Sequence, residues 1–241
     1  MKKLILLLLI VLFCNTTKTY AHTLPDSEYI KVSSDGILLQ SQDAPGAAVK
    51  KNYEAYEKVP ESVKKFLQRH HYHIYLCNEK EERPESGKYL GMTYFTVSNN
   101  SYKLYTDIYC CDREPEDVST LLHEMGHALD YVYSSLLTDY NKYYMVSEDK
   151  LWLYYYKKYI TKIAVLSETS LYNVYNESEA WAECFCYTIL EPEKVEKNMP
   201  EVYKYVQNTV TSVDEYLKTH PSSKQVVKKK TKTKRKSQVE K

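Results

Sequence analysis

Two histidines four residues apart, His123 and His127, enclose Glu124 in the segment "LLHEMGHALD". On a helix, residues i and i+4 project from one face about 6 Å apart, so both imidazoles can reach one ion at the roughly 2.0–2.1 Å that zinc prefers. Glu124 lies about 100° further round the helix, where its carboxylate can take a proton from a water on that ion. The spacing predicts a zinc site with a general base; the alternative is a pair of solvated or core histidines.

A catalytic zinc needs a third protein ligand and leaves one position open. The preferred candidate is Glu179, which follows His127 by 52 residues and lies on a helix of its own. Glu183 projects from the same face one turn later, where its carboxylate could accept the other N–H of a ligand imidazole and fix the tautomer; Asp130 could do the same. Four other histidines are less favoured, because they fall on a predicted polar strand and its flank or at the start of the tail: His70, His71, His73 and His220.

The segments around the motif predict an α+β fold that is mostly helical, with a small mixed sheet preceding the motif helix. Residues 72–78 have the aromatic and β-branched character of a strand, and residues 92–97 and 101–109 alternate as the two strands of a hairpin. The charged segment 79–88 is predicted to be a loop. Helical spacing, or proline and acids at a start, predicts helices over residues 60–70, 114–137, 140–165, 176–190 and 199–219.

Gly126 lies inside the motif, although glycine in a helix costs about 1 kcal/mol relative to alanine. A close backbone neighbour would explain why glycine is tolerated there. We therefore expect another segment of backbone to pass against this side of the motif helix.

The first 21 residues have the layout of a secretory signal peptide, with Lys2 and Lys3 ahead of ten uninterrupted apolar residues and the small residue Ala21 at the end. Ten apolar residues are too few for a transmembrane helix, which needs about 20. We therefore expect an exported, soluble protein. Residues 22–55, largely polar and interrupted by glycine and proline, are predicted to form an irregular leader.

The charge is unevenly distributed along the chain. Residues 1–21 hold three lysines and no acid, and residues 221–241 hold nine Lys/Arg and one acid, out of 33 bases and 32 acids in all. The body between them is therefore acidic, and the basic tail, which has little apolar surface to bury, is predicted to be disordered. The tail lacks aromatic residues for stacking on bases, so we expect no nucleic-acid partner. It could meet an anionic cell-wall polymer or membrane surface, or serve only to solubilise.

Five cysteines follow the predicted signal peptide: Cys77, Cys110, Cys111, Cys184 and Cys186. An odd number means that at least one stays reduced or pairs between molecules. No C-x-x-C pair is present, so a cysteine-based zinc site is not expected, and the sequence leaves the pairing open.

Three segments, "HEMGHALDY", "LYNVYNESEAWAECF" and "MPEVYKYVQ", resemble the catalytic domain of anthrax lethal factor and the secreted Pro-Pro endopeptidases related to it. The resemblance runs from about residue 60 to residue 217. It implies that His123, His127 and Glu179 bind zinc and that Glu124 is the base. In that family a tyrosine seven residues before the zinc glutamate faces the reacting carbonyl. Tyr172 falls at that position, and Tyr175 is a weaker candidate for the same role.

Together these features predict one zincin-like domain over residues 56–220 that holds one Zn²⁺ and acts as a secreted zinc metalloendopeptidase. Its substrates would be extracellular or cell-surface proteins, and an extended segment of the substrate would align on the strand edge at residues 92–109 by β-augmentation. We expect the protein to be a monomer. One alternative is a zinc-containing binding or adhesion module without turnover. Another is a host-directed toxin component like lethal factor, although about 220 residues leave no room for a receptor-binding portion.

Overall fold

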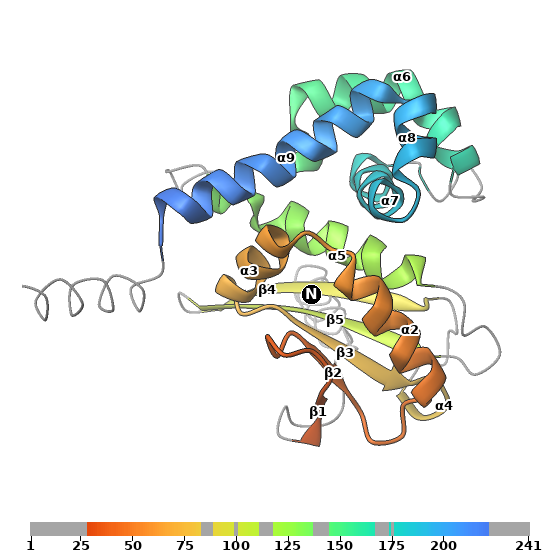
Figure 1. Ribbon diagram of the computed structural model, residues 1–241, viewed down its shortest axis with the longest axis vertical. Coiled ribbons are helices and arrows are strands. Elements are labelled where there is room, and N and C mark those ends of the chain that lie inside the picture. The colour runs from red at the N-terminus through yellow and green to blue at the C-terminus, as the bar shows by residue number, and fades with distance from the viewer. Residues whose placement is uncertain are drawn as a thin grey trace, which may run out of the picture.

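The computed structural model describes residues 28–82, 89–98, 101–110, 118–136, 145–166, 174 and 176–221. The predicted signal peptide and residues 222–241 of the predicted tail lie outside these ranges. Within them the chain forms the predicted α+β fold, in which a mixed sheet lies against helices. Helix α5 (Ser119–Val132), which carries the motif, lies between the sheet and the layer formed by α6 (Lys150–Leu166), α7 (Glu177–Leu190), α8 (Pro192–Asn198) and α9 (Pro200–Thr219) (Figure 1).

The sheet has five strands in the order β1-β2-β3-β5-β4. Their bounds are β1 (Ile30–Lys31), β2 (Leu38–Gln40), β3 (His73–Asn78), β4 (Gly91–Ser98) and β5 (Ser101–Cys110). Strand β3 runs parallel to both β2 and β5, whereas β1 and β4 are antiparallel to their neighbours. The predicted hairpin is confirmed as β4 and β5, with Thr93 opposite Thr106, so these two side chains share the face that meets the helices.

The predicted leader over residues 22–55 is wrong for its described part. This segment contains β1, β2 and most of helix α2 (Gly46–Glu57), and Ile37 and Leu38 are almost fully buried. Gly36, at φ +76°, forms the turn between the two strands, and Pro45 precedes the first turn of α2. Glycine and proline therefore mark element boundaries here, and so short a parallel strand as β2 has no sequence period of its own.

The other predicted helices are found, some of them with shifted ends. Helix α3 (Glu61–Arg69) and α9 match their predictions to within one residue at each end. Helix α6 begins at Lys150 instead of residue 140. The predicted start of α5 at Pro115 lies outside the described residues, where the helix is seen from Ser119 and continues into the turn η2 (Tyr133–Leu136). The charged segment 79–88, predicted to be a loop, begins with the short helix α4 (Glu79–Glu82).

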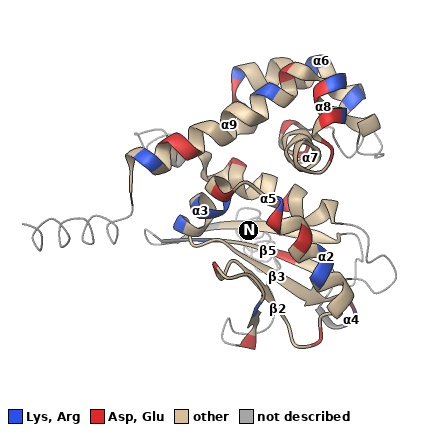
Figure 2. Ribbon diagram, viewed as in Figure 1, with Lys and Arg blue, Asp and Glu red and all other residues tan. Residues whose placement is uncertain are grey.

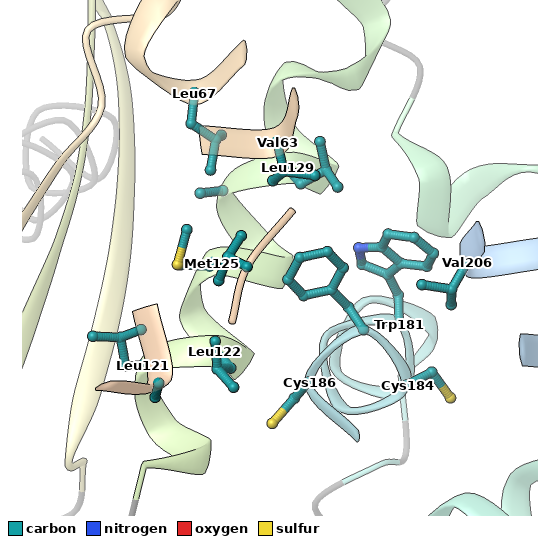
Figure 3. Packing of buried hydrophobic residues seen from close by; sticks show 14 of the residues in the cluster. Val63, Leu67, Leu121, Leu122, Met125, Leu129, Trp181, Cys184, Cys186 and Val206 are labelled. Atoms are coloured by element: carbon teal, nitrogen blue, oxygen red, sulfur yellow. The ribbon is translucent and has the colours of Figure 1, made fainter. Parts of the chain in front are cut away.

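The apolar core lies between the sheet and α5, and extends from α5 to α7. Leu121, Leu122, Met125 and Leu129 of α5 are fully buried, and Trp181 of α7 lies beside them (Figure 3). Strands β2, β3 and β4 carry no charged residue, and the charges are concentrated on the helices (Figure 2). A helix buried on nearly all sides holds its polar residues in fixed positions, which is what a site on α5 requires. No helix in the described part of the chain has the length and apolar character needed to cross a membrane.

Gly126 lies where α5 and α7 cross. A Cβ at this position would come within 2.8 Å of Ala182 Cα, and Trp181 Nε1 donates a hydrogen bond of 3.0 Å to the Gly126 carbonyl. The predicted backbone neighbour is therefore helix α7. Because the contact is with backbone, no side chain can rotate away to make room for a methyl group.

We expect Gly126→Ala to lower the free energy of unfolding, because the forced separation of α5 and α7 outweighs the roughly 1 kcal/mol gained in helix propensity. Overpacking costs about 1–3 kcal/mol, so denaturant unfolding would show a net loss of up to about 2 kcal/mol. Gly46→Ala is the matched control, since a Cβ there would meet nothing within 4 Å. A Gly126→Ala protein as stable as Gly46→Ala would contradict the close crossing.

Candidate metal centre

Three side chains from two helices converge at one point. His123 and His127 project from one face of α5, and Glu179 reaches them from the first turn of α7. The His123 Nε2 atom lies 3.1 Å from Glu179 Oε2 and 3.1 Å from His127 Nε2, and His127 Nε2 lies 3.5 Å from Glu179 Oε1. The start of α7 is fixed by Asn176, whose side chain accepts a hydrogen bond from the Glu179 N–H at 2.8 Å.

The separations between these atoms leave room for one metal ion. Ligand atoms at roughly 2.0–2.1 Å from zinc in tetrahedral directions lie about 3.3 Å apart. The two Nε2 atoms are 3.1 Å apart, the imidazoles contact different oxygens of Glu179 at 3.1 and 3.5 Å, and one ligand atom from each residue lies within 4.8 Å of the other two. Two imidazoles and a carboxylate are also a ligand set that zinc takes in catalytic sites. Among the described residues no other group of three His, Cys, Asp or Glu side chains is placed to hold a metal, so the less favoured histidines form no second centre there.

Each candidate histidine ligand has a polar contact at its outer nitrogen. His123 Nδ1 lies 3.4 Å from Glu183 Oε1, as predicted for Glu183. His127 Nδ1 lies 3.2 Å from Ser178 Oγ, which in turn donates to Asp130 Oδ2 at 3.0 Å. Asp130 therefore acts through Ser178 and not directly on an imidazole. Acceptors at both Nδ1 atoms favour the tautomer that leaves the Nε2 lone pairs directed to the common centre.

The electrostatics of the centre favour positive charge. Burial lowers the pKa of His123, but hydrogen bonds with Glu179 and Glu183 outweigh it and raise that pKa to about 10. Burial raises the pKa of Glu179, but its hydrogen bonds with His123 and His127 outweigh this effect and lower it. Carboxylates packed against imidazoles thus attract a cation, which either protons or a metal ion can supply.

Glu124 lies beside the three converging residues and not among them. It is 8% exposed, and its Oε2 atom accepts a hydrogen bond of 2.6 Å from Thr93 Oγ1 on β4. Gly91 allows this close approach of strand and helix, because a Cβ there would come within 3.0 Å of Glu124 Cγ. The carboxylate is therefore held at the rim of the centre, where a water-activating base is expected.

His123, Glu124, His127 and Glu179 line one cavity of about 1090 Å³, whose wall continues through Tyr89, just before β4, to Gly91 and Thr93 on β4. Within the described residues β4 pairs only with β5, so β4 is an edge strand, and its residues Gly91, Met92 and Thr93 line the cavity. An unpaired strand edge can add an extended peptide as a further strand.

Two predicted positions lie outside the described residues, namely Tyr172 and Tyr175. The four described cysteines are buried, and none is joined to another of the four by a disulfide. Cys111 also lies outside the described residues, so the pairing stays as open as the sequence left it.

Sequence reasoning did not identify Thr93, Ser178 and Ser147, although each contacts a residue of the centre or its support. Ser147 N–H donates to Asp130 Oδ1 at 2.8 Å. Burial raises the pKa of Asp130, and the hydrogen bonds from Ser147 and Ser178 oppose that rise. No local pattern distinguishes these hydroxyl residues from the other serines and threonines of the chain.

No protein-family profile matches the chain, and a search of curated proteins finds no significant match. Among solved structures, a Pro-Pro endopeptidase from Paenibacillus alvei is similar with a TM-score of 0.47 and 16% sequence identity, over 71% of this chain and 94% of that chain. A likeness of this size is insufficient to assign a function, which must come from the residues of the site.

Proposed function

We propose that this protein is a secreted zinc metalloendopeptidase. The convergence of His123, His127 and Glu179, with Glu124 held beside them on a large cavity, is the observation that carries the proposal. The predicted signal peptide supports export, and the resemblance to the lethal factor and Pro-Pro endopeptidase family supports peptide hydrolysis. The substrate would be an extended segment of an extracellular or cell-surface protein.

In this proposal zinc, held by His123, His127 and Glu179, would supply a Lewis acid for the attacking water and the scissile carbonyl. Glu124 takes a proton from the water molecule while the oxygen of that water adds to the carbonyl carbon. Glu124 then gives that proton to the amide nitrogen, the C–N bond breaks, and a carboxyl group and a free amine result. Tyr172, assigned by the family resemblance, would donate a hydrogen bond to the carbonyl oxygen as negative charge develops there.

A binding module without turnover is less consistent with the site. A purely structural zinc site has four protein ligands and no cavity at the ion. Here three candidate ligands line a cavity of about 1090 Å³ together with a buried carboxylate from the same helix. An open cavity beside a base is the arrangement that hydrolysis needs.

The test combines metal analysis with cleavage of a randomised peptide library by the purified protein. We expect one zinc per chain, cleavage of a subset of peptides, loss of cleavage on treatment with a chelator, and its return on adding zinc. Bound zinc without cleavage of any peptide would favour the binding module. Material that stays without zinc under metal-replete preparation would contradict the metal centre itself.

A further inference from the structure

A line of hydroxyl groups runs from the core of the domain to Glu124. Tyr72, just before β3, has its hydroxyl 2.6 Å from Thr106 Oγ1 on β5. Thr106 Oγ1 lies 2.7 Å from Thr93 Oγ1 on β4, and Thr93 Oγ1 lies 2.6 Å from Glu124 Oε2 on α5. Four side chains from separate parts of the fold therefore form one continuous chain of hydrogen bonds.

The chemistry of the groups gives this chain a direction. An ionised carboxylate can only accept, so Thr93 donates to Glu124, Thr106 donates to Thr93, and Tyr72 donates to Thr106. Burial raises the pKa of the Tyr72 hydroxyl, which keeps its proton and remains a donor. Each hydroxyl that accepts a hydrogen bond becomes a better donor to the next group, so the chain strengthens the bond to the carboxylate.

The chain is anchored in the buried interior of the domain. Tyr72 is 1% exposed and Thr106 is fully buried, whereas Thr93 is only partly buried and lines the cavity. Thr93 Oγ1 also lies 3.0 Å from the Glu124 carbonyl oxygen, so both the side chain and the backbone of Glu124 are close to it. The single hydroxyl proton of Thr93 is shared with, or directed to, the closer acceptor Oε2, so one carboxylate oxygen is held from the sheet.

We propose that the Tyr72–Thr106–Thr93 chain is a positioning device that holds the carboxylate of Glu124 in orientation for proton transfer. This inference rests on the proposed peptidase function and deepens it, since it assigns a role to three residues outside the metal-binding motif. Catalysis is sensitive to the placement of a base. A hydrogen bond to one oxygen of the carboxylate restricts its rotation and so keeps the base in place.

The test compares Thr93→Val, which keeps the shape and removes the hydroxyl, with Thr93→Ser, which keeps the hydroxyl. We expect Thr93→Val to lower kcat by about 10- to 100-fold, the effect of losing a hydrogen bond to a charged group, with KM within about twofold and zinc content unchanged. Thr93→Ser should retain most of kcat. A crystal structure of zinc-loaded Thr93→Val should show the Glu124 side chain in more than one rotamer or in a new one.

Thr188→Val is the matched control, because Thr188 on α7 is also buried but has no hydrogen-bond partner at its Oγ1 among the described residues. We expect its kcat to equal that of the wild type. Equal kcat in Thr93→Val and the wild type, or an equal loss in Thr93→Ser and Thr93→Val, would overturn the inference. A wild-type protein without peptidase activity would instead overturn the proposed function, and the Glu124 rotamer in Thr93→Val would still test the hydrogen-bond chain.

Discussion

Glu124→Gln should keep its zinc, and its kcat should fall by at least about three orders of magnitude. The loss of the general base, together with the loss of its charge from the transition state, accounts for an effect of this size. Glutamine has the size of glutamate, and its amide oxygen can still accept the Thr93 hydrogen bond, so the local structure should persist. An amide cannot take a proton from water near neutral pH, and the attacking water would therefore stay undeprotonated. Steady-state kinetics on a cleaved peptide, with metal analysis of the same sample, measure both quantities.

The position of Glu124 makes this prediction specific. Because its Oε2 is held by Thr93 and it is not one of the three converging residues, neutralising it should leave the ligand set unchanged. Glu196→Gln on the exposed side of α8 removes the same charge from a residue that does not line the cavity and should leave kcat as in the wild type. Undiminished turnover in Glu124→Gln would refute its role as the base. Loss of zinc in that variant would show that Glu124 supports the metal instead.

The part of the site that the sequence predicted is the part encoded by local spacing. The pair His123 and His127 is four residues apart on one helix, so the geometry of a single turn brings them together. Glu179 could be proposed as their partner because the segment after Asn176 has a recognisable helix start with a capping residue. The structure places that first turn directly against α5, through a crossing that only glycine at position 126 allows.

The supporting residues could not be predicted, because their contacts depend on tertiary structure. Thr93 meets Glu124 across 31 residues of sequence, and Ser178 meets His127 across 51. A threonine on a strand, or a serine in the first turn of a helix, can equally well point into solvent or make such a contact. Whether Thr93 points into solvent or contacts Glu124 depends on the register of β4 against β5 and on how closely the sheet packs against α5.

The prediction of an irregular leader is wrong over residues 28–55 for a related reason. Strand β2 is three residues long and gains its stability from pairing with β3, which begins more than 30 residues later. Short strands have too few residues for an alternating pattern to stand out from polar surroundings. The burial of Ile37 and Leu38 shows that this segment belongs to the domain core.

Glu179→Gln should abolish zinc binding at concentrations that saturate the wild type, with an increase in Kd of more than about 100-fold. Loss of a supporting residue outside a ligand set typically costs about 10- to 100-fold in metal affinity, and Glu179 stands in the proposed ligand set itself. The amide of glutamine is neutral, and its oxygen is a poorer metal ligand than a carboxylate oxygen. The centre would therefore hold the zinc dication with one negative charge fewer. Competition with a chromogenic chelator measures the Kd, and peptidase activity should fall in proportion to zinc occupancy.

Glu177→Gln is the matched control for this variant, since Glu177 lies in the same first turn of α7 and carries the same charge near the same helix end. It should bind zinc as tightly as the wild type, because it is not one of the three converging residues. Equal weakening in the two variants would mean that general negative charge, and not coordination by Glu179, holds the cation. Unchanged affinity in Glu179→Gln would remove the third ligand from the centre, and the proposed hydrolase chemistry would then lose its geometric basis.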